Sequence, residues 1–162
     1  MKILVVSDTH GYIDDALLKH AQTADEIWHA GDIGSIDVLY KLQKITKVRA
    51  VYGNIDAADV RQETSKNLFF KVQNIPVCIT HIGGYPGKYN ADFKHYIQTH
   101  SPQIIVCGHS HILKVMYDET HSALFINPGA IGIHGFHAAR TMITFDIENN
   151  TPQNMKVIEY QR

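Results

Sequence analysis

Two histidines one residue apart follow a short apolar segment, in the sequence Gly108-His109-Ser110-His111. The apolar run 104–107 before them predicts a buried strand that ends at the glycine. In an extended segment, side chains two residues apart project from the same side, so both imidazoles can face one site. Neutral imidazole is the commonest protein ligand for transition metals. The pair could therefore form part of a metal site, but taken alone the favoured explanation is two solvated loop histidines, and the rest of the chain decides between the two.

Five further polar side chains occur where other predicted strands end. They are Asp8 and His10 after 3–7, Asp32 after 26–30, Asn54 after 47–52 and His81 after 75–80. Ligand crevices in open α/β sheets lie beyond the carboxyl ends of the strands, so these side chains can converge. Each has an ordinary explanation when taken alone, as a helix cap, a turn residue or a strand-end histidine. Seven such residues at strand ends together favour one shared metal site.

The types of these ligands restrict the metal. Two carboxylates, one amide oxygen and four imidazoles suit borderline divalent ions, of which we expect manganese first and iron, nickel, cobalt or zinc as alternatives. Magnesium and calcium prefer oxygen ligands and match the set less well. Seven ligands are too many for one tetrahedral ion, whereas two divalent transition-metal ions that share a carboxylate would use them all.

The elements that must position these side chains alternate between strand and helix at first and are mostly strands afterwards. Helices are predicted from Asp14, from a Ser35 cap with an apolar face of Ile36, Leu39 and Tyr40, and from an Asn90 cap to Ser101. The polar segment 57–66 supports no clear prediction. Strands are predicted at 3–7, 26–30, 47–52, 67–73, 75–80, 103–107, 113–117, 123–126, 141–147 and 155–160. This order predicts two sheets stacked face to face with helices outside.

Length and composition indicate one globular domain, residues 1–162. The net charge of −1 gives no electrostatic signal for binding nucleic acid or an acidic membrane surface. No apolar run reaches the ~18 residues of a membrane span, and the chain start lacks a signal-peptide pattern. Cys78 and Cys107 lie in apolar runs, as buried free thiols do. We therefore expect a cytoplasmic protein.

In chain order, these residues resemble the signature of the calcineurin-like metallophosphoesterases, D-x-H, G-D, G-N, H and G-H-x-H. The matching segments are Asp8-Thr9-His10, Gly31-Asp32, Gly53-Asn54, His81 and Gly108-His109-Ser110-His111. The segment Asn127-Pro128-Gly129-Ala130 is similar to the N-P-G-S of small bacterial and archaeal phosphodiesterases in this superfamily. The resemblance implies an α/β fold, a four-layer αββα sandwich of two mixed β-sheets flanked by helices, with a dinuclear metal centre.

The resemblance also assigns roles to single residues. It places Asp8, His10, Asp32 and His111 on one ion, and Asp32, Asn54, His81 and His109 on the other, with Asp32 as the bridge. In catalysis, Asn54 is expected to contact a phosphate oxygen, His109 to stabilise developing charge and Asp8 to orient the attacking water. Asp56 is expected to support the site or cap a helix rather than bind metal.

The implied function is hydrolysis of a small phosphodiester by a metal-activated hydroxide. One residue departs from the family pattern, because many members carry a histidine after Gly-Asn that protonates the leaving group, and this chain has Ile55. Such an acid contributes ~10²–10⁴-fold in rate. The alternatives are a phosphomonoesterase on the same site, and a non-catalytic protein-interaction scaffold with a vestigial metal site, as in members related to a subunit of the eukaryotic retromer coat.

Three histidines and the last two strands stay outside this assignment. We expect His29 to be buried or turned from the site. His134 and His137 could reach the substrate side of the cleft, but we expect solvated loop histidines. The hairpin of 141–147 and 155–160 completes a sheet or presents an edge for homo-oligomer formation.

Overall fold

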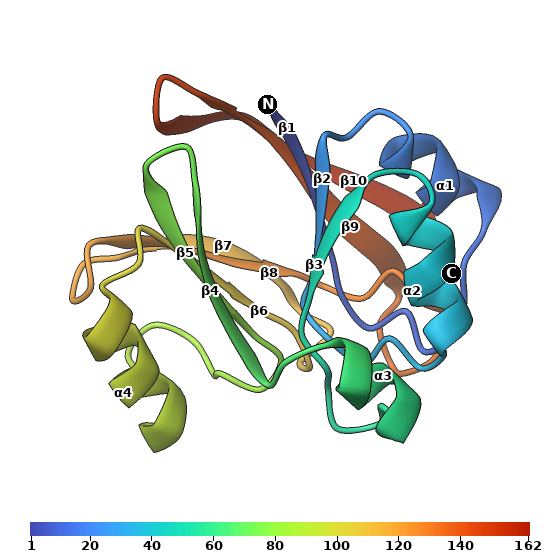
Figure 1. The fold of residues 1–162 in the computed structure, drawn as a ribbon, viewed down its shortest axis with the longest axis horizontal. Coiled ribbons are helices and arrows are strands. Elements are labelled where there is room, and N and C mark those ends of the chain that lie inside the picture. The colour runs from blue at the N-terminus through green and yellow to red at the C-terminus, as the bar shows by residue number, and fades with distance from the viewer.

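Two five-stranded sheets stack face to face at the centre of the computed structural model, which describes residues 1–162 (Figure 1). The first sheet has the order β10-β9-β1-β2-β3 and the second β4-β5-β6-β8-β7. The first contains β1 (Lys2–Val6), β2 (Glu26–His29), β3 (Lys47–Ala50), β9 (Ala139–Glu148) and β10 (Thr151–Gln161). The second contains β4 (Asn67–Val72), β5 (Ile75–Thr80), β6 (Ile104–Cys107), β7 (Leu113–Asp118) and β8 (Ala123–Pro128).

Both sheets are mixed. Strands β1, β2 and β3 pair in parallel, whereas β9 runs antiparallel to both β1 and β10. In the second sheet β5, β6 and β8 pair in parallel, and the antiparallel strands β4 and β7 form its two edges. Each predicted strand is present, with ends that differ by a few residues, and the predicted hairpin of β4 and β5 is confirmed.

Helices cover the outer face of each sheet. Figure 1 shows α1 (Asp15–Ala21), α2 (Ile36–Gln43) and α3 (Ala58–Glu63) beside the first sheet, and α4 (Ala91–His100) beside the second. The four layers are therefore helix, sheet, sheet and helix, which confirms the predicted αββα sandwich. None of the helices combines the length and the apolar character of a membrane span.

The central strands are buried on both faces, which explains why they are continuous apolar runs. In β1, Ile3 and Val5 belong to the core between the two sheets, while Leu4 and Val6 pack against the helices. Strand β6 alternates in the same way between the central core and the core under α4. A strand of this kind has no solvent-facing residues, so its register is set by two cores at once.

Three of the four helices begin at a side-chain cap. Asp14, Ser35 and Asn90 each accept a hydrogen bond from a backbone N–H in the first turn of α1, α2 and α4, which confirms the predicted caps Ser35 and Asn90. Helix α3 was not predicted, because Ala57 at its N-cap offers no side-chain hydrogen bond and the segment is mainly polar.

The inner face of α2 differs from the prediction. Leu39 faces the core as expected, together with Val38 and Leu42. Tyr40 is 44% exposed and Ile36 is only partly buried, so the predicted apolar face was wrong for Tyr40. The phenol of a tyrosine can remain in water while an aliphatic neighbour fills the core.

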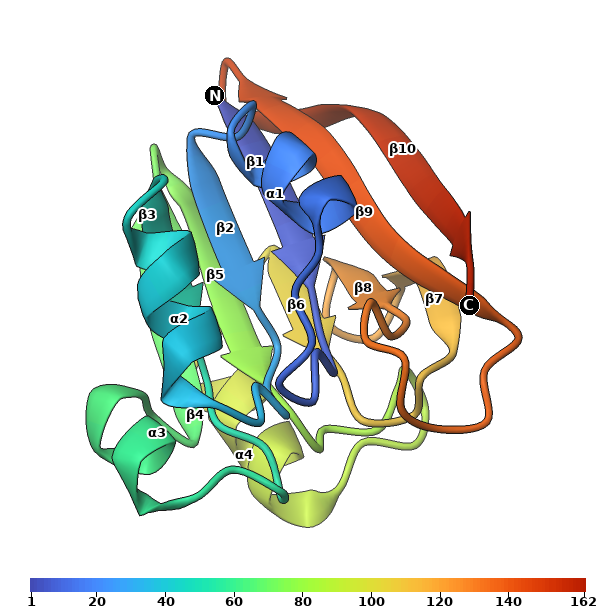
Figure 2. The ribbon, with the colours of Figure 1, turned by 90° about the vertical axis from the view of Figure 1, so that its right-hand side faces the viewer.

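One end of the sandwich collects the loops that carry the predicted metal ligands. Figure 2 shows the arrowheads of β1, β2, β5 and β6 directed toward the same end of the molecule. The parallel pairing of β1 with β2 and of β5 with β6 requires this arrangement within each sheet. Residues far apart in the sequence therefore meet at this end.

A buried carboxylate links β2 to β3 at the ends of these strands that lie away from the ligand loops. Glu26 is 4% exposed and accepts hydrogen bonds from Arg49 Nε at 2.8 Å and Trp28 Nε1 at 3.2 Å. Lys47 Nζ lies 2.8 Å from the same carboxylate. Burial alone would raise the pKa of Glu26, but these three partners outweigh it and hold that pKa below its usual value of 4.5.

Replacing this carboxylate by an amide should lower stability by an amount that depends on pH, because only the wild-type side chain titrates. Glu26→Gln should lower the free energy of unfolding at pH 7 by about 2 kcal/mol, because hydrogen bonds to a charged group are lost. A depressed folded-state pKa stabilises the fold above pH 4.5, and this contribution disappears as the pH falls through the lower folded-state value. Urea unfolding at several pH values measures it. Glu63→Gln, at an exposed position, is the control, and a wild-type-to-variant difference that is the same at every pH would contradict the assignment.

Candidate metal centre

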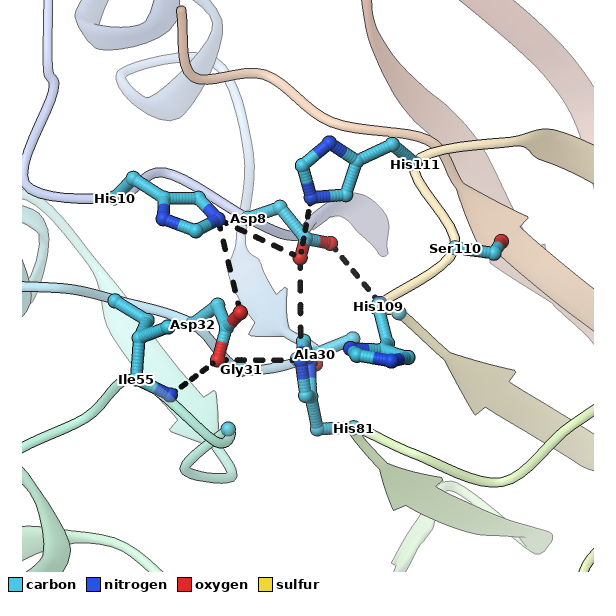
Figure 3. A network of polar contacts seen from close by, with 12 residues as sticks. Asp8, His10, Ala30, Gly31, Asp32, Ile55, His81, His109, Ser110 and His111 are labelled. Atoms are coloured by element: carbon cyan, nitrogen blue, oxygen red, sulfur yellow. Dashed lines mark hydrogen bonds and ion pairs between the residues drawn. The ribbon is translucent and has the colours of Figure 1, made fainter. Parts of the chain in front are cut away.

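Six of the seven predicted ligands lie together at the carboxyl ends of β1, β2, β5 and β6 (Figure 3). They form two groups, in each of which the ligand atoms lie within 4.8 Å of one another. The first group contains Asp8, His10 and His111, and the second contains Asp32, His81 and His109. The structure thus brings together side chains from four loops, as the strand-end pattern predicted.

Asp32 lies between the two groups. Its Oδ1 is 3.2 Å from His81 Nε2, and its Oδ2 is 3.6 Å from His10 Nε2. Burial raises the pKa of Asp32, but the contact with His81 and the N–H of Ile55 outweigh burial and hold that pKa below its usual value. Asp32 is therefore an anion at neutral pH and offers one oxygen to each group, which is the arrangement that a bridging carboxylate needs.

The centre of the cluster contains polar atoms without partners. Asp8 Oδ1, His10 Nε2 and His81 Nε2 are buried and make no hydrogen bond. Asp8 Oδ1 lies 3.1 Å from His111 Nε2 and 3.9 Å from His81 Nε2. Buried polar atoms that lack partners are costly, and cations bound by the two groups would compensate them. Mixed carboxylate and imidazole donors suit a borderline divalent ion, so the residues present fit a metal.

The backbone at these residues adopts a conformation that is rare outside glycine. The φ angles are 56° at Asp8, 48° at His10, 51° at Asp32, 69° at His109 and 56° at His111. A left-handed conformation costs a residue with a Cβ roughly 1–2 kcal/mol. Strain of this kind concentrates at functional sites, where the surrounding structure imposes it. Here it turns each loop sharply after its strand and directs five ligands inward.

The ring of His81 is held in one orientation. Its Nδ1 donates a hydrogen bond to the carbonyl of Ala30 at 2.7 Å, so Nε2 faces the cluster. Burial lowers the pKa of His81, but the carboxylates of Asp32 and Asp8 outweigh burial and raise it. Gly53 makes this packing possible, because a Cβ there would collide with Asp32 Oδ1 and approach His81 Cδ2.

Asp56 connects the loop after β2 to the loop after β3. Its carboxylate accepts hydrogen bonds from the backbone N–H groups of Ile33 at 3.1 Å, Gly34 at 2.7 Å and Gly53 at 2.7 Å. Asp56 is 4% exposed and belongs to neither ligand group. Its role is therefore structural support for the loops that carry Asp32 and Asn54, as the sequence predicted.

The Asn127-Pro128-Gly129 segment supports the turn that carries both histidines of the opening motif. Asn127 is buried, and its amide donates to the carbonyl of Gly108 at 2.9 Å and to Ser110 Oγ at 3.1 Å. Its Oδ1 accepts from the N–H of Gly129 at 3.0 Å. Because Gly108 and Ser110 flank His109, this side chain fixes the position of the first histidine.

Asn54, the seventh predicted ligand, lies at the edge of the cluster. Its side chain is exposed and lines a cleft of about 530 Å³ with Asp32, His109 and His111. Ile55 lines the same cleft with its side chain 44% exposed, and its N–H donates to Asp32 Oδ1 at 3.1 Å. The residue after Asn54 therefore offers this cleft an aliphatic group and no proton donor.

The three further histidines near the predicted site have different surroundings. His29 is fully buried, as predicted, and donates from Nε2 to Thr9 Oγ1 at 3.0 Å; burial lowers its pKa to about 4, so the ring is neutral. His134 is exposed, with its ring centroid 4.9 Å from that of His10. The prediction of a solvated loop histidine was wrong for His137, whose Nδ1 lies 3.2 Å from Nδ1 of His111. The loop before β9 folds back over His111, and only the position of His137 just after the Asn-Pro-Gly turn signalled this in the sequence.

Comparison with known proteins agrees with this geometry. A family model of the calcineurin-like phosphoesterase superfamily domain matches residues 1–150. A probable metallophosphoesterase of Methanothermobacter thermautotrophicus is 27% identical over 135 residues, which cover 80% of this chain and 77% of that protein.

Two solved structures illustrate the shared fold. An archaeal phosphodiesterase has a TM-score of 0.70 at 21% identity, with 98% of this chain and 100% of that chain covered. Wild-type Vps29 from Entamoeba histolytica, solved as a complex with Zn²⁺, has a TM-score of 0.75 at 17% identity, with 99% of each chain covered. At these identities the likeness concerns the fold alone. The match of the family model over residues 1–150, together with the cluster of ligands, shows that this chain belongs to the calcineurin-like phosphoesterase superfamily.

Proposed function

We propose that this protein is a dinuclear-metal phosphodiesterase that hydrolyses small phosphodiesters. The observation that carries the proposal is the pair of ligand groups around buried atoms that have no partner inside the protein. The family supplies the reaction class, phosphoester hydrolysis with divalent metal ions. Two ions at the site and a diester as the substrate are our proposals beyond the family's reaction class.

The two ligand groups suit two ions. Asp8, His10 and His111 would hold the first, and His81, His109 and Asn54 the second. Asp32 would contribute to both, since its two oxygens face different groups. Bound divalent ions, manganese first among them, would polarise a phosphoryl oxygen and lower the pKa of water at the site.

The protein's own groups would bind and orient the phosphate. The Asn54 amide lines the cleft and can donate to a phosphoryl oxygen. The His109 ring is exposed to the same cleft, so the nitrogen that does not face the metal can contact developing charge. Asp8 would orient the attacking water, as its unpartnered Oδ1 faces the cluster. Ile55 cannot donate a proton, so a good leaving group should react fastest.

The shape around the cluster favours a diester over a monoester. A second hollow of about 400 Å³ adjoins the cleft, and both are lined by His109, Ser110 and Ile112. Exposed apolar side chains line both spaces: Ile55 and Phe136 in the cleft, Ile82 and Tyr85 in the second hollow. A diester carries a substituent on each side of its phosphate and can occupy both, whereas a monoester has only one.

The scarcity of cationic side chains around the cleft also favours a diester over a monoester. No lysine or arginine lines the cleft beside the ligand cluster, and the adjoining hollow has one, Lys114. A phosphomonoester is close to a dianion at neutral pH, and sites that recognise such groups commonly use arginine. A phosphodiester carries a single negative charge and needs less compensation from the protein. The monoesterase alternative therefore has weaker support.

The scaffold alternative rests on the same apolar side chains. Phe136 is fully exposed and Ile112 is 63% exposed beside the cluster, which a protein partner could cover. The solved structures of Vps29, whose name stands for vacuolar protein sorting 29, share this fold, so the fold also occurs in proteins that are named for sorting. Against the scaffold alternative stands the cluster of six predicted ligands, which a scaffold does not need.

The first test compares two substrates with the same leaving group. With Mn²⁺ added, bis(p-nitrophenyl) phosphate should be hydrolysed with a kcat/KM at least about tenfold above that of p-nitrophenyl phosphate, because its second ring fills the adjoining hollow. Release of p-nitrophenolate measures both rates. A faster monoester would favour the monoesterase, and no turnover of either with metal demonstrably bound would favour the scaffold.

The second test removes the bridging carboxylate. Asp32→Asn should lower kcat/KM for the diester by at least about 100-fold, more than the loss usual for residues around a metal site, while the fold remains intact. Circular dichroism checks the fold. Asp59→Asn on the exposed side of α3 is the matched control and should retain wild-type activity. Wild-type activity in Asp32→Asn would contradict the assignment of the site.

The third test separates the two ions. His111→Ala should weaken mainly the site of Asp8 and His10, and His109→Ala mainly the site of His81 and Asn54. Isothermal titration with Mn²⁺ and metal analysis after dialysis measure the stoichiometry and affinity of each site. Equal loss of both ions from either variant would count against two separate sites divided between the histidines.

A further inference from the structure

His137 makes two contacts that the proposed function does not use. It lies between β8 and β9, with its Nδ1 3.2 Å from Nδ1 of His111 and its Nε2 2.9 Å from the carbonyl oxygen of Gly132. His111 has no other side-chain hydrogen bond, and its Nε2 faces Asp8 Oδ1 at 3.1 Å. The two rings thus form a chain from a backbone carbonyl to the ligand cluster.

The protons in this chain can be placed from the carbonyl end. The oxygen of Gly132 only accepts, so Nε2 of His137 carries the hydrogen. A neutral imidazole has one N–H, which leaves Nδ1 of His137 as an acceptor. Nδ1 of His111 must then donate to it. Nε2 of His111 is consequently left with a free lone pair that points into the cluster.

A free lone pair facing a carboxylate oxygen is unfavourable without a cation between them. Asp8 Oδ1 is buried and makes no hydrogen bond, so it too has no partner within the protein. The tautomer of His81 is fixed in the same way but without an intervening residue. Its Nδ1 donates directly to the carbonyl of Ala30, and its Nε2 faces the cluster. At His111 a second histidine connects the ligand to the carbonyl.

We propose that His137 is a positioning residue that sets the tautomer of His111, so that Nε2 of His111 is presented as a metal ligand. The proposal rests on the proposed metal site. Partners of this kind around metal-bound histidines fix ring orientation and tautomer, and their loss typically lowers metal affinity about 10- to 100-fold.

Gly135 shows that the loop is built around the two rings. Its φ angle is 120°, which a residue with a Cβ rarely adopts. A Cβ at this position would lie 2.5 Å from Nδ1 of His111 and 3.2 Å from Nδ1 of His137. Gly135→Ala should therefore disturb the pair without removing either histidine.

The experiment reads the tautomer of His111 in the metal-free protein. Long-range ¹H–¹⁵N correlation spectra at about pH 8, above the usual pKa of histidine, show which ring nitrogen carries the hydrogen. Wild type should have the hydrogen of His111 on Nδ1. In His137→Leu it should move to Nε2, where it can be donated to Asp8 Oδ1. His134→Leu, in the same loop but without a hydrogen bond to His111, is the matched control and should leave the His111 signals unchanged.

Affinity for Mn²⁺ supplies the second readout. His137→Leu and Gly135→Ala should each weaken the first ion about 10- to 100-fold, and His137→Gln should restore much of the loss, since an amide offers one acceptor and one donor. Equal losses in the Leu and Gln variants, or an unchanged His111 tautomer in His137→Leu, would overturn the proposal. Because the spectra are recorded without metal, the expected tautomer shift in a protein that hydrolyses no phosphodiester would contradict the proposed function and support this inference.

Discussion

Two buried carboxylates facing four imidazoles are the feature on which this end of the molecule depends. The side chains of Asp8 and Asp32 approach these rings, yet Asp8 Oδ1 and two of the ring nitrogens have no hydrogen-bond partner in the protein. Without a cation, these buried atoms would lose their hydration with no compensation. The surrounding structure nevertheless holds them there, with five ligand residues in the left-handed conformation and with Asp56 and Asn127 fixing the loops. Stability is given up locally for a preformed site.

The same end of the molecule combines polar and apolar recognition. The cluster would bind the phosphate, while the cleft with Ile55 and the adjoining hollow with Tyr85 offer apolar walls to its substituents. Ile55 contributes an aliphatic side chain to this surface and cannot donate a proton. Ile55 thus bears on two expected preferences of the enzyme. Because it cannot donate a proton, good leaving groups should react fastest, and because it is apolar, it should favour an apolar substituent in the cleft.

Much of this could be predicted from the sequence, because the pattern and the physical cause coincide. Central strands such as β1 are apolar on both faces, and the ligands follow the strand ends where parallel topology places them together. Helix α3 was not predictable in this way, because Ala57 gives no cap signal. The contact of His137 with His111 was missed because it depends on how a loop folds back in space. The left-handed angles likewise arise from tertiary packing: Asp and His adopt them more often than most residues, but their type alone does not say which of them will.

The central claim is that two ions occupy the two ligand groups. Crystals grown with Mn²⁺ and measured at the manganese absorption edge test it directly through anomalous difference maps. The account predicts two peaks, one among Asp8, His10 and His111 and one among His81, His109 and Asn54, with Asp32 between them. A single peak, or peaks elsewhere on the surface, would contradict it.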